Sequence, residues 1–254
     1  LTAHMRTPAG EACTWDGASF SWQSPDGVKC SILNSPPSQR IATDEVVSSL
    51  IEAYPKAVES RTTDGHNALH IGALTGAPPS VLSAMLAVYP IGLQQRVWRI
   101  TPLPRGGTSN HYPSDVLGVG QLPLHLAASA HPPAPLETVA YLLAQYPQGA
   151  STPDSVGNLP LHLAVHSAAP LSTIEQLLAT HPEGAAHTDN QGRLPLHLAA
   201  LSSAPLEVVE RLIVAYPEGP SLRDGDGARA VHLAVQQRPH DLDVLRVLTN
   251  ANAA

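Results

Sequence analysis

A six-residue string that returns at a nearly fixed interval constrains this chain more than any other feature. Leu-Pro-Leu-His-Leu-Ala occurs at 122–127, 159–164 and 194–199, and degenerate copies flank the series on both sides. The shared histidines are 55, 37, 35 and 35 residues apart, and each follows a glycine by five residues. They are His70, His125, His162, His197 and His232. Such a period predicts a solenoid in which each unit packs only against its neighbours.

Each unit is predicted to contain two helices and a turn. The proline of the string suits the first position of a short helix, where its missing N–H costs nothing. The second helix of one unit shows apolar residues at helical spacing, including Leu206, Val209 and Ile213, and Pro217 ends it. Stretches such as Asp189–Gly192 supply tight turns, with glycine where a positive φ is needed.

These residues resemble the ankyrin-repeat family, whose unit carries Thr-Pro-Leu-His-x-Ala. The resemblance runs from Thr43 to about Leu248, with a longer unit of about 35 residues and with leucine where the family has threonine. It implies an all-α, ankyrin-type helical repeat solenoid with short projecting turns and an irregular N-terminal segment. Because threonine pairs with the histidine in that family, we expect a backbone carbonyl to be the histidine's partner here.

The chain divides into two predicted domains. Residues 1–42 hold three of the few aromatic residues and two Asp-Gly turns, which predicts a short hairpin or irregular cap. Residues 43–254 form the repeat domain, with one half unit, five units and an insertion. The half unit spans 43–64, the units start near 65, 120, 157, 192 and 227, and the insertion lies within 93–119.

The insertion is the predicted source of partner specificity. It adds 20 residues to one turn, since the first histidine spacing is 55 residues, whereas the next is 37 and the last two are 35. Its arginine and aromatic residues are types enriched at binding hot spots, and we expect partner contacts from Arg96, Trp98, Arg99, Arg105 and Tyr112. The alternative that Trp98 packs over the neighbouring unit stays open. We also expect partner contacts from Asn158 and Arg193, which directly follow turn glycines.

Charge and apolar runs exclude two classes of partner. Fourteen Lys and Arg against 21 Asp and Glu give a net charge of −7, which argues against nucleic acid. Residues 65–95 carry no charge apart from histidine, but Pro78, Pro79 and Pro90 divide this stretch into runs too short to span a membrane. A disulfide between Cys13 and Cys30 stays open.

The sequence indicates no catalytic residue, cofactor or metal site. It contains no phosphate-binding Gly-x-x-x-x-Gly-Lys motif and no Gly-x-Ser-x-Gly elbow. His162 and His166 have the spacing of two metal ligands, but no third ligand is suggested. Asp224–Gly227 lacks the later glutamate of a calcium loop.

The resemblance and the repeats favour a non-catalytic scaffold that binds another protein through the concave face and fingers of the solenoid. The alternative is a regulatory or targeting arm of a larger enzyme whose catalytic domain lies outside this chain. An enzyme within the chain would depend on residues 1–42 or on the insertion, where His4, His111, Cys13 and Cys30 stand out. We expect the protein to be monomeric. Because no signal-peptide pattern begins at Leu1, we expect it to be intracellular, in the cytoplasm.

Overall fold

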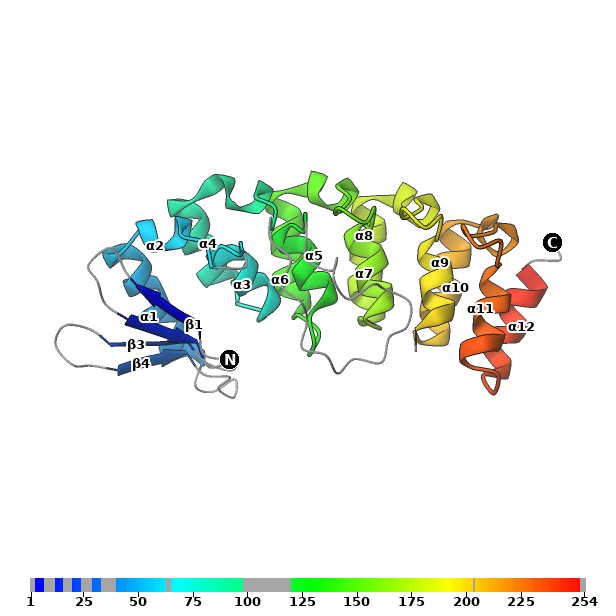
Figure 1. Ribbon diagram of the computed structural model, residues 1–254, viewed down its shortest axis with the longest axis horizontal. Coiled ribbons are helices and arrows are strands. Elements are labelled where there is room, and N and C mark those ends of the chain that lie inside the picture. Colours follow the sequence, from blue (N-terminus) through cyan, green and yellow to red (C-terminus); the bar gives the residue numbers. More distant parts are fainter. Residues whose placement is uncertain are drawn as a thin grey trace.

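The chain forms an elongated row of helix pairs that follow one another in sequence order (Figure 1). This computed structural model describes residues 3–6, 12–15, 20–23, 29–32, 40–62, 65–97, 120–202 and 204–251. The repeats are all-α, as the sequence predicted. Each inner helix packs on the inner helix of the next unit and on the outer helix of its own.

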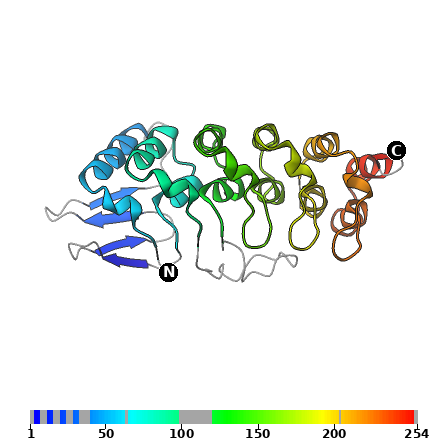
Figure 2. The ribbon, with the colours of Figure 1, turned by 90° about the horizontal axis from the view of Figure 1, so that it is seen from above.

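Two rows of helices build the solenoid, and Figure 2 shows them from above. The inner helices are α3 (Ala68–Leu74), α5 (Pro123–Ser129), α7 (Pro160–His166), α9 (Pro195–Leu201) and α11 (Ala230–Gln237). The outer helices are α4 (Pro79–Val88), α6 (Leu136–Gln145), α8 (Leu171–Thr180), α10 (Leu206–Ala215) and α12 (Leu242–Ala251). Two helices, α1 (Arg40–Ala53) and α2 (Lys56–Glu59), precede the first full pair.

Proline sets the ends of these helices. In α7, Pro160 is the first helical residue and Leu159 before it is extended, with ψ of 162°. The outer helix α6 ends at Gln145 with Tyr146 as its C-cap, because Pro147 cannot continue the helical hydrogen bonding and begins a 3-10 turn instead. These 3-10 turns are η2 (Pro90–Gln94), η3 (Pro147–Ser151), η4 (Pro182–Ala186) and η5 (Gly219–Ser221).

Leucine and other aliphatic side chains from both rows form one continuous core. Leu159, Leu198, Ile174 and Val209 are fully buried, and equivalent positions in the neighbouring units are buried as well. Because every junction between units buries the same positions, each junction contributes to the free energy of unfolding.

The N-terminal segment contains four strands, which is more regular structure than the predicted hairpin or irregular cap. The strands β1 (Ala3–Arg6), β2 (Ala12–Trp15), β3 (Phe20–Gln23) and β4 (Lys29–Ile32) pair antiparallel in sequence order. Figure 1 shows them at the N-terminal end of the row.

The sheet register answers the question of the disulfide. Cys13 on β2 and Cys30 on β4 are both paired with Trp22 of β3, so one strand separates them. Neighbouring strands lie about 4.8 Å apart, which puts the two cysteines about 10 Å from each other. A disulfide needs a Cα separation below about 7 Å, so this backbone does not allow the bridge.

Candidate interaction surface

Short hairpin turns, called fingers here, project from the inner row on the side away from the outer helices (Figure 2). In the third finger, an Oδ1 atom of Asp154 accepts the backbone N–H groups of Val156 and Asn158, each at 2.9 Å. Gly157 follows with φ of 84° and donates its N–H to the Asp154 carbonyl at 3.2 Å. Asp189 and Asp224 close the fourth and fifth fingers with the same bonds.

Backbone hydrogen bonds join successive fingers. The N–H of Asn190 donates to the carbonyl of Val156 at 3.0 Å, and the N–H of Gly225 donates to that of Gln191 at 2.8 Å. A Cβ on Gly157 would lie 2.7 Å from the nitrogen of Asn190, so only glycine allows this approach. The last three fingers therefore form one connected ribbon.

The second finger departs from this pattern. Val97 takes the place of the aspartate, and its backbone still pairs with Gln121 and Gly120 at 2.9 and 2.6 Å. Between those paired residues the chain has 22 residues (98–119), where the third finger has two. The insertion thus leaves from the tip of the second finger. Trp98, Arg99, Arg105 and Tyr112 lie outside the described residues, so their predicted contacts stay predictions.

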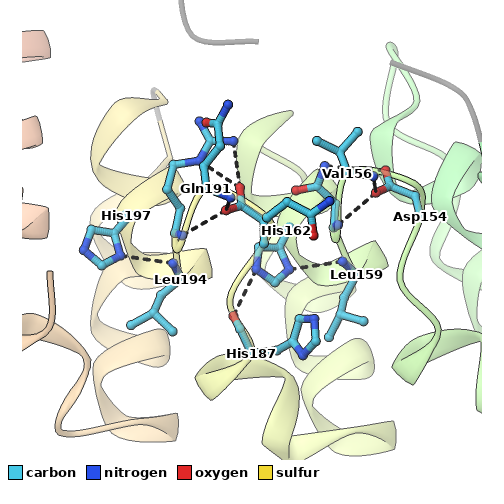
Figure 3. A network of polar contacts seen from close by, with 12 residues as sticks. Asp154, Val156, Leu159, His162, His187, Gln191, Leu194 and His197 are labelled. Carbon is cyan, nitrogen blue, oxygen red and sulfur yellow. Dashed lines mark hydrogen bonds and ion pairs between the residues drawn. The ribbon is translucent and has the colours of Figure 1, made fainter. Parts of the chain in front are cut away.

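Each buried repeat histidine ties its own inner helix to the following finger, as Figure 3 shows for His162. Its Nδ1 accepts the N–H of Leu159 at 3.2 Å, and its Nε2 lies 3.1 Å from the carbonyl oxygen of His187. Since Nδ1 accepts, the proton is on Nε2 and donates to that carbonyl. For His197 the carbonyl belongs to Leu222, which like His187 lies five residues before a turn glycine. For His70 and His125 it belongs to Gln121 and Asn158, which directly follow a turn glycine. The prediction of a backbone carbonyl partner is confirmed.

Burial keeps these imidazoles neutral. Loss of hydration lowers the pKa of His70 to about 3 and the pKa values of His125 and His162 to about 4, and it lowers the pKa of His197 as well. Both ring nitrogens of His162 are engaged, so the His162–His166 spacing does not make a metal site. Among the residues that the structure describes, no group of three His, Cys, Asp or Glu is arranged to hold a metal ion.

Two of the predicted partner-binding residues lie inside the fingers. Asn158 is fully buried beneath Asp154. Arg193 is 4% exposed, and its Nε and Nη2 atoms lie 2.8 and 2.7 Å from an Asp189 oxygen. Both side chains stabilise their own fingers and face no solvent, so in this structure neither offers a surface to a partner.

Arg96, also predicted to bind a partner, is exposed but already bridges two fingers. Its Nη1 donates to the carbonyls of Gly120 and Pro153, at 3.2 and 2.8 Å. Arg61 makes the equivalent pair of bonds one finger earlier, to Gly65 and Arg96, both at 3.1 Å. Sequence reasoning did not identify Arg61, although arginine precedes the finger in three of the five units.

The solvent-accessible part of this side of the molecule is narrow. In both α7 and α9, the first proline and the five residues that follow it are all buried. Exposure returns at the finger tips, at Ser155, Asn190, Gln191 and Asp226. A partner on this side therefore meets the finger tips and the C-terminal ends of the inner helices.

Fold and geometry define a helical repeat protein whose buried histidines hold a row of fingers. Residues 161–254 match the family model of ankyrin repeats, in three copies, and no curated protein matches the chain. Residues 161–254 are therefore ankyrin repeats, and the two units before the matched region have the same helix pairs and histidine links. Ankyrin repeats are generally protein-interaction modules and are typically non-catalytic. In the described part of the chain, no helix has the length and apolarity to cross a membrane.

Proposed function

We propose that this chain is a non-catalytic scaffold that binds a protein partner through its finger tips and through the insertion on the second finger. The observation that carries the proposal is the connected ribbon of fingers, which exposes its tips while its bases are buried. A surface that is ordered before binding loses little conformational entropy on association. The buried histidines belong to the supports of this ribbon and are not available for proton transfer at neutral pH.

The insertion is proposed as the main source of specificity. The insertion leaves from the neck of the second finger, that is, from Val97 and Gly120, which are joined by a backbone hydrogen bond. The helix stack therefore does not require a particular length or sequence of the insertion. Arg99, Arg105, Trp98 and Tyr112 supply forked donors and large contact areas within it. A protein partner without nucleic acid agrees with the net charge of −7. A monomeric state and a place in the cytoplasm remain part of the proposal.

A matched set of variants tests the proposal by affinity capture from an extract of the source cells, followed by mass spectrometry. The first variant replaces residues 98–119 with Ser-Val, the two residues of the third finger. The second changes two exposed tips, Gln191→Arg and Asp226→Lys. The control is Glu175→Gln, on the exposed face of the outer helix α8.

We expect the control to retain every protein that the full chain captures. The first variant should lose at least ~10-fold of the specific partner, which corresponds to about 1.4 kcal/mol of binding free energy. The tip variant should weaken the same partner. Retention of the partner by both altered chains, with their folds intact by circular dichroism, would contradict the assignment of this surface.

A further inference from the structure

The guanidinium of Arg96 is held firmly at one nitrogen and is open along one edge. Its Nη1 donates to the carbonyls of Gly120 and Pro153, at 3.2 and 2.8 Å. A guanidinium has five N–H donors, so these bonds leave the Nε and Nη2 atoms of Arg96 without a partner in the described part of the chain. The side chain is exposed. Arg96 therefore presents a fixed pair of donors to solvent.

The equivalent edge of Arg61, one finger earlier, is already occupied. Its Nη2 donates to the side-chain oxygen of Gln95. In the next unit, Thr152 takes the place of Gln95, because it directly precedes Pro153 as Gln95 precedes Arg96. The Thr152 hydroxyl donates instead to the carbonyl of Gln148 at 2.7 Å. The repeat thus fills the second edge of one arginine and leaves that of the other open.

No carboxylate of the described residues neutralises Arg96. Arg193 shows the alternative, because its Nη2 lies 2.7 Å from an oxygen of Asp189. Arg96 has only backbone carbonyls as partners, and no ion pair joins it to an acidic side chain in the described part of the chain. An arginine that is fixed in place and lacks a counter-ion is suited to bind one from another molecule.

The distribution of exposed charge favours an acidic ligand at this place. Arg96 is the one exposed charged residue in the described bases and turns of the second, third and fourth fingers, at 95–97, 120–122, 152–158 and 187–193. The outer helices, on the side away from the fingers (Figure 2), carry exposed glutamates at 137, 175, 207 and 210. An acidic partner is therefore attracted to this part of the finger row and repelled from the outer row.

We propose that the Nε and Nη2 edge of Arg96 binds a side-chain carboxylate from an acidic segment of the protein partner. The inference rests on the proposed function, because it names the chemistry of the partner at one point of the finger surface. The planar fork of a guanidinium matches the two oxygens of a carboxylate. A phosphate has three acceptor oxygens and needs more donors than this edge supplies, so glutamate or aspartate is favoured over a phosphorylated residue. The site adjoins Val97, where the insertion leaves the second finger.

An NMR titration of the full chain with isotope-labelled arginine tests the site. The probe is a hexapeptide of alternating glycine and glutamate, blocked at both ends. We expect it to shift the Nε–H signal of Arg96 and not that of Arg61. Thr152→Gln keeps Arg96 and the net charge but supplies the acceptor that Gln95 gives to Arg61. It should weaken peptide binding by at least ~10-fold, since the donors are then occupied.

The reverse substitution, Gln95→Thr, opens the edge of Arg61, whose Nε–H signal should then respond to the peptide. Arg96→Lys should bind as weakly as Thr152→Gln, although its charge is kept. Arg246→Gln, on the exposed side of α12, should bind as the parent chain does. An Arg96 signal that does not move, or a folded Thr152→Gln chain that binds as tightly as the parent, would overturn the proposal. Tighter binding of the same peptide with phosphoserine in place of glutamate would overturn the choice of a carboxylate.

Affinity capture with Thr152→Gln separates this inference from the proposed function. Weakened capture of the specific partner supports the carboxylate site. If Thr152→Gln retains the partner while replacement of residues 98–119 loses it, the carboxylate site is wrong and the proposed function stands. If neither the Thr152→Gln chain, the tip variant nor the shortened chain loses the partner, the proposed function is wrong as well.

Discussion

The second and third fingers begin from the same position in the repeat and end differently. The third closes within four residues, because Asp154 accepts two backbone N–H groups across the turn. The second has Val97 there, which is 1% exposed and has no side-chain acceptor, and 22 residues intervene before the chain returns. The two ends of each finger are nevertheless paired by backbone hydrogen bonds, and a carbonyl in each finger accepts a hydrogen bond from the histidine of the preceding unit. The comparison separates two roles, since the histidine link holds the neck and the aspartate closes the tip.

Acidification should have the largest effect on stability, because it breaks the histidine hydrogen bonds at the second finger and at the fingers closed by aspartate alike. In the unfolded chain these histidines titrate near pH 6.5, whereas in the folded chain the pKa is about 3 for His70 and about 4 for His125 and His162. Below pH 6.5 the unfolded state thus binds more protons. The free energy of unfolding should be constant above pH 7 and fall steadily from pH 6.5 to about 4.

The expected loss is on the order of 3 kcal/mol for each of His125 and His162. Burial raises the pKa of Asp154, which opposes this trend to a smaller extent. Urea unfolding at a series of pH values measures the slope. A stability that stays level down to pH 4.5 would show that the histidines are not buried in their neutral form.

Removing a closing aspartate should be the next largest effect. Asp189→Ala leaves two backbone N–H groups without their acceptor and leaves the buried guanidinium of Arg193 without its carboxylate. We expect a loss of ~3–5 kcal/mol. Val97→Ala, at the same position of the open finger, should cost only ~1–2 kcal/mol, because it removes apolar contact alone. Equal losses in chemical denaturation would mean that the aspartate has no special part in closing the finger.

The histidine link itself should be worth less than the charged pair. His162→Ala should cost ~1–3 kcal/mol, since the N–H of Leu159 and the carbonyl of His187 both lose a partner. His232→Ala is the matched control, because this histidine is exposed and makes only the bond within its own unit. Thermal unfolding of the two variants side by side gives the difference. An equal shift would place the histidine's contribution within the unit and not between units.

Closing the second finger should have the smallest effect on stability. We expect Val97→Asp, combined with replacement of residues 98–119 by Ser-Val, to raise the free energy of unfolding by about 1–2 kcal/mol through the shorter loop. Differential scanning calorimetry against the parent chain measures the change. A loss of several kcal/mol would show that the insertion packs on the stack, as the alternative for Trp98 holds.

The sequence predicted the features that recur in every unit. It did not predict the features that depend on the side chains of a single unit. Identical strings fixed the helix pairs, the turn glycines and the histidine partner, because the same local physics acts in each copy. The burial of Asn158 and Arg193 was not predictable from their place after a glycine, since it depends on which way the hairpin turns its side chains. Arg61 was missed because its two acceptors lie in different fingers, one of them 35 residues away.

Four paired strands in the first 32 residues also exceeded the prediction. Each strand is only four residues long, and the aromatic residues and Asp-Gly turns in this segment indicated a hairpin without giving the number of strands. The register that separates Cys13 from Cys30 is set by pairing between strands, which spacing along the chain does not determine.

The paired neck of the second finger makes this position an attachment point. Val97 and Gly120 meet at one end of the insertion, so a segment of different length or sequence starts and finishes at the same place. A peptide epitope, a fluorophore-binding sequence or a small folded domain whose termini lie close together meets the same geometric condition. The second finger can therefore carry a different segment while the repeats that hold it stay the same.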